Sequence, residues 1–114
     1  MAESKQIEEI LNAVGIPTAY RQFKPFKGKP VPPPPYLVYY AERESGRGAD
    51  GKDLYKQLHI VVELYTDKKT PTLENRVEGA INEFEFDKYE DYIDEERMWC
   101  VSWEFDIYQK IRRI

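Results

Sequence analysis

The apolar residues near the N-terminus recur with the spacing of one helix face. They occupy positions i, i+3, i+4 and i+7, at Ile7, Ile10, Leu11 and Val14, and this spacing places them on one side of an α-helix. Gly15 and Pro17 supply a stop signal directly afterwards. Because a helix of about three turns is unstable on its own, we expect its apolar face to pack against another element.

Two segments in the middle of the chain have the composition of β-strands. Residues 36–42 read YLVYYAE and residues 57–65 read QLHIVVELY, and both are dense in β-branched and aromatic side chains. In the second segment alternate apolar residues share one face, at Leu58, Ile60, Val62 and Leu64. Residues 45–53 between them hold three glycines and no apolar side chain larger than alanine. We therefore predict a long hairpin whose tip, residues 43–54, is a flexible loop.

The C-terminal half predicts a second helix and a second pair of strands. Pro71 suits the first position of a helix capped by Thr70, and an apolar face follows at Leu73, Val77, Ala80, Ile81 and Phe84. Residues 83–96 are rich in acids, with a short strand expected around residues 89–93. The last strand shows the clearest pattern, an alternation of polar residues with Trp99, Val101, Trp103, Phe105 and Ile107.

This order of elements predicts an α+β fold, in which a single mainly antiparallel β-sheet carries two α-helices on one face. The length of 114 residues is that of a single domain, residues 1–114. Residues 18–35 break the pattern, because basic and aromatic residues alternate there and a run of prolines follows. We expect an extended basic, proline-rich arm, with an edge strand near residues 20–23.

The composition excludes several classes of protein. A formal net charge of -4 argues against a general nucleic-acid binder, which normally carries a basic surplus. Cys100 is the only cysteine, so a disulfide framework is excluded. No apolar run approaches the ~20 residues that a membrane-spanning helix needs. We expect a soluble protein of a reducing compartment, with no membrane partner.

Few side chains in the sequence point to catalysis. His59 could act as a general base near neutral pH, but we place it in a strand, on the face opposite Leu58 and Ile60. No serine or cysteine nucleophile lies next to it in sequence. Cys100 is interpreted as a small strand side chain, since nothing in the sequence marks a base that would stabilise its thiolate. We expect no catalytic residue.

The sequence also lacks the spacing of a known cofactor or metal site. The acids of residues 83–96 match no calcium-binding loop, and we interpret them as a solvated face. The segment SGRGADGK at residues 45–52 lacks the spacing of a phosphate-binding loop, and it joins two strands rather than a strand and a helix. We therefore expect neither a cofactor nor a metal.

Charged residues in three places are candidates for protein–protein contacts. The first group lies in the arm, at Arg21, Lys24, Lys27 and Lys29. The second lies in the predicted hairpin loop, at Arg43, Glu44, Arg47, Asp50 and Lys52. The third is acidic and lies at Glu90, Asp91 and Asp94. Contacts between such groups on successive copies close into a ring when the rotation permits, and charge complementarity sets their register.

Three stretches resemble the small head–tail joining and tail-terminator proteins of long-tailed bacteriophages and prophages of Gram-positive bacteria. They are YLVYYAERE (residues 36–44), YKQLHIVVELYTDKKTPTLENRVEGAINEF (residues 55–84) and EDYIDEERMWCVSWEFDI (residues 90–107). The most recognisable pieces are VELYTDKK at residues 62–69, before a helix, and YIDEE at residues 92–96, before an aromatic strand.

The resemblance implies a structural virion subunit that forms a ring, typically a hexamer, at the top of the tail tube. Such a ring ends tube growth, docks to the head connector or stopper protein, and lets DNA pass without binding it specifically. The implied partners are sister copies, the major tail-tube protein and the connector, in the host cytoplasm during assembly and then in the virion. We expect acidic side chains to line the channel and residues 43–52 to contact the tube or adaptor.

Two other functions stay open at this point. A small α+β enzyme or nuclease-like toxin would use His59 together with nearby tyrosine and glutamate side chains. A monomeric adaptor would instead use the PxxP spacing of residues 30–35 to bind an aromatic groove.

Overall fold

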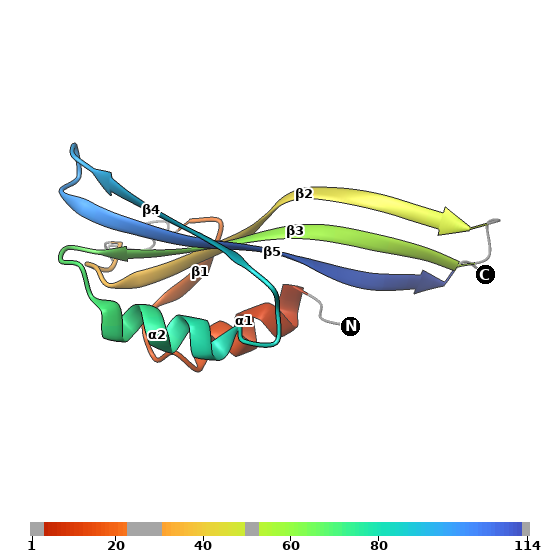
Figure 1. Cartoon of the computed structure of the whole chain (residues 1–114), viewed down its shortest axis with the longest axis horizontal. Helices are drawn as coiled ribbons and strands as arrows, with labels where there is room; N and C mark the ends of the chain where they lie inside the picture. The colour runs from red at the N-terminus through yellow and green to blue at the C-terminus, as the bar shows by residue number, and fades with distance from the viewer. Residues whose placement is uncertain (1–3, 23–30, 50–52, 113–114) are drawn as a thin grey trace.

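The computed structural model describes residues 4–22, 31–49 and 53–112. In chain order these residues form α1 (Ser4–Asn12), β1 (Thr18–Tyr20), β2 (Tyr36–Ala49), β3 (Asp53–Thr66), α2 (Pro71–Ala80), β4 (Asp87–Ile93) and β5 (Met98–Arg112). Both helices lie on the same side of one sheet (Figure 1). The predicted α+β architecture is confirmed.

The sheet has the strand order β1-β2-β3-β5-β4. The pair β1–β2 is parallel, and the pairs β2–β3, β3–β5 and β4–β5 are antiparallel. Strand β1 lies slightly earlier in the chain than the edge strand expected near residues 20–23. Its position follows from backbone hydrogen bonds at both of its ends: Leu37 N–H donates to the Pro17 carbonyl, and Arg21 N–H donates to the Tyr39 carbonyl, both at 2.8 Å.

The core lies between the two helices and the sheet face that they cover. Its fully buried side chains include Ile7 and Leu11 of α1, Val77 of α2, and Ile60, Val62 and Trp103 of the sheet. These residues belong to the helical and strand periodicities read from the sequence, so the predicted apolar faces are confirmed. The alternate side chains of each strand point to the opposite, uncovered face.

The helix ends follow the sequence signals with one difference. Gly15 has φ +89°, a left-handed conformation that glycine adopts without a steric penalty, and its N–H donates to the Asn12 carbonyl at 3.1 Å. Pro71 opens α2, and Thr70 is the N-cap residue. The Thr70 hydroxyl, however, donates to the Lys68 carbonyl at 2.7 Å and makes no capping hydrogen bond to the helix.

The predicted flexible loop at residues 43–54 is too long. Strand β2 continues to Ala49 and β3 begins at Asp53, with pairs such as Gly46↔Lys56 and Gly48↔Leu54. The polar and glycine-rich composition of this segment does not prevent pairing, because backbone groups alone form the ladder and β5 supports β3 from its other side as far as Arg112. Asp50 and Lys52 lie outside the described residues.

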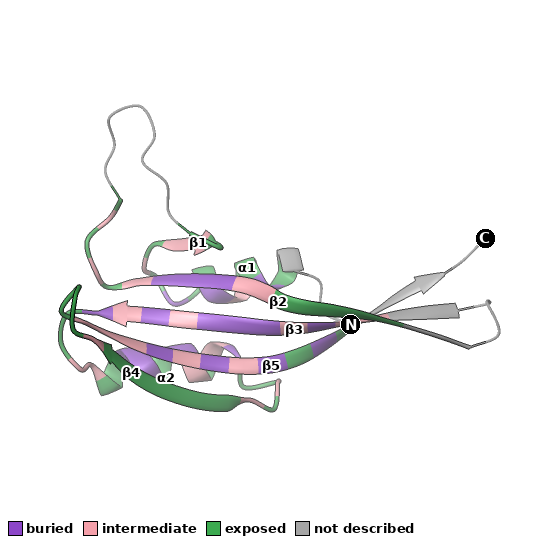
Figure 2. Ribbon diagram, turned by 90° about the horizontal axis from the view of Figure 1, so that it is seen from above, coloured by how far each residue is buried: buried purple, intermediate pink, exposed green. Residues whose placement is uncertain are grey.

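Three strands extend beyond the helices as a projecting sheet. Figures 1 and 2 show β2, β3 and β5 continuing past α1 at one end of the molecule. The radius of gyration is 16.0 Å and the principal extents are 50 × 34 × 26 Å, whereas a compact chain of this length would have a radius of gyration of about 13 Å. The molecule is therefore elongated along its strands.

Candidate functional site

The sheet face that the helices leave uncovered is acidic. Cross-strand neighbours on this face form rows, such as Tyr40–Val61–Glu104–Asp87 and Arg43–His59–Asp106. The strand side chains that the structure describes contribute six carboxylates to it, at Glu42, Glu63, Asp87, Asp91, Glu104 and Asp106. Among the side chains that the structure describes on this face, Arg43 and His59 are the basic ones. The part of the open face whose side chains are described consequently carries a negative net charge at neutral pH.

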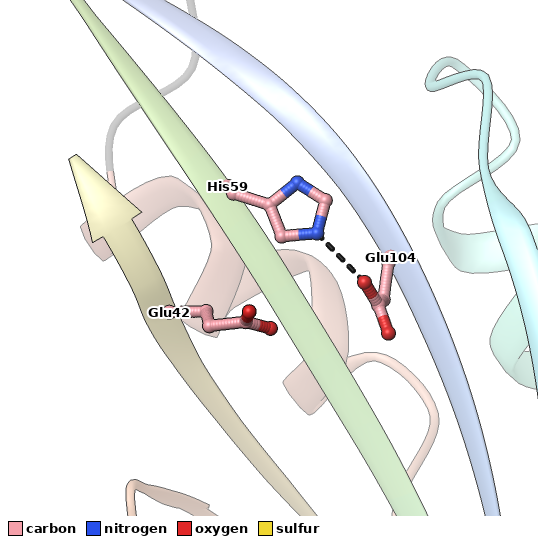
Figure 3. A group of neighbouring side chains, drawn as sticks. All are labelled: Glu42, His59 and Glu104. Atoms are coloured by element: carbon pink, nitrogen blue, oxygen red, sulfur yellow. Dashed lines mark hydrogen bonds and ion pairs between the residues drawn. The ribbon is translucent and has the colours of Figure 1, made fainter. Parts of the chain in front are cut away.

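His59 lies between two carboxylates of the neighbouring strand β5. Its Nε2 atom is 2.7 Å from Glu104 Oε1, and its Nδ1 atom is 2.7 Å from Asp106 Oδ1 (Figure 3 shows the first contact). Gln57 Nε2 donates to the second oxygen of Asp106 at 3.1 Å. The imidazole is thus held at both nitrogen atoms, and the carboxylate on one side is itself held in place.

The contacts shift the titration of this cluster. The hydrogen bond to Glu104, and then that to Asp106, raises the pKa of His59 above its ordinary 6.5, although partial burial opposes the change. The hydrogen bond from His59 in turn lowers the pKa of Asp106. The geometry therefore favours the protonated imidazole between the two carboxylates.

Glu42 reaches the same cluster from β2 because of an irregularity in the ladder. The register passes from Ala41↔Ile60 to Arg43↔His59, so Glu42 is an extra residue with no partner of its own across the strand. One ligand atom each from Glu42, His59 and Glu104 lies within 4.8 Å of the other two (Figure 3). Three strands therefore bring one imidazole and two carboxylates together on the open face.

A second polar cluster lies on this face toward the other end of the sheet. The Tyr65 hydroxyl donates to Glu63 at 3.0 Å, and the Tyr40 hydroxyl donates to the other oxygen of Glu63 at 3.4 Å. The Tyr36 ring stacks on Tyr65 with centroids 5.1 Å apart. Burial, followed by the charge of Glu63, raises the pKa of Tyr40 to about 12. Burial likewise raises the pKa of Cys100 to about 11, so its thiol stays protonated at neutral pH.

A surface hollow of about 600 Å³ lies between α1 and β5. Its lining includes the apolar residues Ile10, Phe84 and Ile107 and the carboxylates of Glu9 and Glu83. No histidine, cysteine or serine is among its described lining residues. This hollow is an open concavity beside β5, and the residues around it offer no pairing of a nucleophile with a base.

The charged groups singled out from the sequence are placed apart from one another. Arg43 lies on the open face beside His59, whereas Glu44 forms an exposed ion pair with Lys56 at 2.8 Å. Arg47 lies in β2, and nothing is described of its side chain. Arg21 is exposed after β1, with its guanidinium 5.3 Å from the centroid of the Tyr20 ring. Lys24, Lys27 and Lys29 lie outside the described residues.

The acidic group is divided between the two sides of β4. Glu90 bonds to Lys69 and so faces the helix side, Asp91 lies opposite Cys100 on the open face, and Asp94 lies in the turn before β5. Of the basic residues predicted for the arm, only Arg21 is among the described residues. A contact between the arm and these acidic residues is therefore not described.

The sequence placed His59 correctly on the open face but did not reveal its partners. Glu104 and Asp106 lie 45 and 47 residues further along the chain. The available signal was the alternation in the last strand, where the polar residues Glu104 and Asp106 flank Phe105 and so share one face. Whether these two carboxylates lie beside His59 depends on the register between β3 and β5, which periodicity alone does not specify.

Comparison of the sequence with protein-family models and with curated proteins finds no match. Neither helix in the described part of the chain is both long and apolar enough to cross a membrane.

Proposed function

We propose that this chain is a structural subunit of a phage tail, a tail-terminator or head–tail joining protein that forms a ring on the tail tube. In this proposal the ring ends tube growth, docks to the head connector and lets DNA pass. The observation that carries the proposal is the projecting sheet of β2, β3 and β5, which offers two long edges to sister copies. The resemblance of residues 36–107 to that family supports it.

The two edges arise because the outer strands are short. Strand β1 pairs with β2 only along residues 37–39, and β4 pairs with β5 only along residues 98–104. Among the described residues, no strand pairs with the outer edge of β2 beyond Tyr40 or with that of β5 beyond Phe105. Open edges of this kind bind strands of another chain through backbone hydrogen bonds.

The same edges support a ring rather than a pair of copies. Strands β2 and β5 are both antiparallel to β3 and hence parallel to each other, so the β2 edge of one copy can meet the β5 edge of the next head to tail. Contacts between unlike surfaces close into rings. Six copies contributing three strands each would supply about 18 strands, a size at which a closed barrel encloses a water-filled channel.

The charge of the open face supports its placement toward the channel. Among the side chains described on this face, six carboxylates accompany two basic groups, Arg43 and His59, and His59 contacts two of those carboxylates, Glu104 and Asp106. An acidic lumen repels phosphate at short range, because charges interact strongly within a Debye length of about 8 Å. DNA would then pass without being held.

Electron microscopy of tube ends tests the proposal. The purified chain is mixed with tail tubes assembled from the tube protein alone, and we expect ring-shaped caps that stop further growth at one end. Glu44→Lys should lower the capped fraction several-fold, because it reverses a charge in the segment assigned to the tube contact and removes only an exposed ion pair. Glu8→Lys, an equal charge change at an exposed position of α1, is the control. Bare tube ends with the unmodified chain would refute the function.

The His59 cluster favours a second candidate, a small hydrolytic enzyme. An imidazole positioned by carboxylates at both nitrogens on an open face has the composition of a general acid–base group. In that case the chain should hydrolyse a substrate such as RNA or plasmid DNA, and His59→Ala should abolish the activity while leaving the oligomer unchanged. Absence of any turnover that depends on His59 would eliminate this candidate.

A further inference from the structure

The open face places three metal-ligating side chains on three adjacent strands. Glu42 comes from β2, His59 from the central strand β3 and Glu104 from β5, with one ligand atom of each within 4.8 Å of the others (Figure 3). Strand β3 pairs with β5 without interruption through His59, and with β2 on its other side with one irregularity, at Glu42. Side chains carried by such paired strands are held more rigidly than side chains on loops.

The irregularity in β2 decides which side chains surround the imidazole. Arg43 pairs with His59 across the ladder, so its cationic side chain belongs to the same cross-strand row as His59 and Asp106. Glu42 is displaced by the irregularity toward the neighbouring row, which contains Glu104. Glu42 and Glu104 therefore gather with the imidazole, while Asp106 contacts its Nδ1 atom. β-Bulges commonly re-aim side chains next to functional sites in this way.

The remaining ring nitrogen has the partner that a metal-binding histidine requires. Asp106 Oδ1 is 2.7 Å from Nδ1, and Gln57 holds the other oxygen of Asp106 at 3.1 Å. Histidine ligands almost always donate their second N–H to a carboxylate or carbonyl, which fixes the ring and directs the other nitrogen to the metal. Here this arrangement directs Nε2 toward Glu104 and Glu42.

We propose that Glu42, His59 and Glu104 form a binding site for one divalent transition-metal ion of the zinc type, with Asp106 as the group that orients the histidine. One imidazole and two carboxylates suit zinc and neighbouring first-row ions, whereas calcium requires six to eight oxygen ligands. Three protein ligands leave at least one position open, and the open face gives that position to water.

Binding requires side-chain movement and loss of the proton from His59 Nε2, because a histidine binds a metal ion as the neutral imidazole. At metal–ligand distances of about 2.1 Å, two ligand atoms of a tetrahedral site lie about 3.4 Å apart, so the 2.7 Å hydrogen bond between His59 and Glu104 must open by less than an ångström. Glu104 has 28% of its side-chain surface exposed, and Glu42 is exposed. Both carboxylates can therefore rotate without disturbing the core.

Competition between the full chain and a chromophoric chelator for Zn²⁺ at pH 7.5 tests the site. We expect one ion per chain, with a dissociation constant below about 0.1 mM. Glu42→Gln removes an exposed ligand without affecting the fold and should weaken binding at least tenfold. Asp106→Asn should weaken it about 10- to 100-fold through loss of the orienting group. Asp91→Asn, the same change of charge on the same face outside the cluster, is the matched control and should alter binding less than twofold.

Two results would overturn the proposal. One is the absence of saturable binding at one ion per chain in the unmodified protein. The other is an equal loss of affinity in Glu42→Gln and Asp91→Asn, which would mean that the acidic face attracts the ion without coordinating it. Co²⁺ provides an independent measurement, because intense visible absorption bands at one equivalent report four-coordinate ligation. Those bands should vanish in His59→Gln, a variant whose folding is checked by circular dichroism.

Discussion

Besides its backbone pairing with β5, strand β4 is linked to α2 by ion pairs that include one buried carboxylate, Glu74, and removal of that charge should destabilise the protein. Glu74 of α2 is 4% exposed. It forms ion pairs with Lys69, just before the helix, and with Lys88 of β4, the second at 3.0 Å. Burial by itself would raise the pKa of Glu74, but the hydrogen bonds from the two lysines outweigh it and lower the pKa below 4.5. Glu74 therefore remains charged in the folded protein.

The structure limits the size of the effect of Glu74→Gln. Removal of one partner from a fully buried ion pair costs about 3–5 kcal/mol, whereas an exposed pair contributes less than about 1 kcal/mol. Here the lysine side chains are 32% and 33% exposed, and each has a second carboxylate, Glu90 for Lys69 and Glu78 for Lys88. We therefore expect Glu74→Gln to lower the free energy of unfolding by about 2 kcal/mol at pH 7, between the two limits.

The pH dependence separates the charge from the packing. A carboxylate whose pKa is lowered in the folded state stabilises the protein above its unfolded-state pKa, and this contribution is lost as the pH falls through the folded-state pKa. Urea unfolding at a series of pH values should thus show a constant difference between the two proteins near neutrality. The difference should shrink as the pH drops below 4.5. Glu90→Gln, which removes an exposed partner of Lys69, is the control and should cost less than about 1 kcal/mol. Equal stability at pH 7, or a difference unchanged in acid, would refute the reasoning.

Two further predictions concern the backbone and the thiol. Gly15→Ala places a side chain at φ +89°, 3.2 Å from Arg76 Nη2, and should lower the unfolding free energy by about 1–2 kcal/mol; an unchanged denaturation midpoint would contradict the assigned strain. Burial raises the pKa of Cys100 to about 11. Its thiol should therefore react with iodoacetamide at pH 7.5 about 100-fold more slowly than the thiol of an unperturbed cysteine. Mass spectrometry measures that rate, and modification at the rate of a free thiol would show that Cys100 is accessible.

Local periodicity was sufficient for the helices, the strands and their faces. Ile7 and Leu11 are buried where the spacing of three and four residues placed them, and Trp103 and Phe105 are buried where the alternation placed them. The physical reason is that the direction of a side chain depends on the backbone geometry of its own segment. An apolar face is then buried by whichever element packs against it, and the predicted α+β architecture supplied that element.

The ends of the strands were decided by tertiary contacts. The glycines at positions 46 and 48 indicated a loop, yet both residues are paired with β3. A strand persists as long as its neighbours offer backbone partners, and the neighbours of β3 continue on both sides to the end of the projecting sheet. Composition reports the local preference of a segment and carries no information about such distant support.

The candidate site divides in the same way. By itself the sequence determined that His59, Glu104 and Asp106 lie on the polar faces of two strands, because alternation sets the face of each side chain. Only the tertiary structure decided that they meet. The register of β3 against β5 and the extra residue at Glu42 set the distances among the four side chains, and a shift of one residue would turn His59 to the opposite face of the sheet. Register is a collective property of the whole ladder and its core, so no short stretch of residues specifies it.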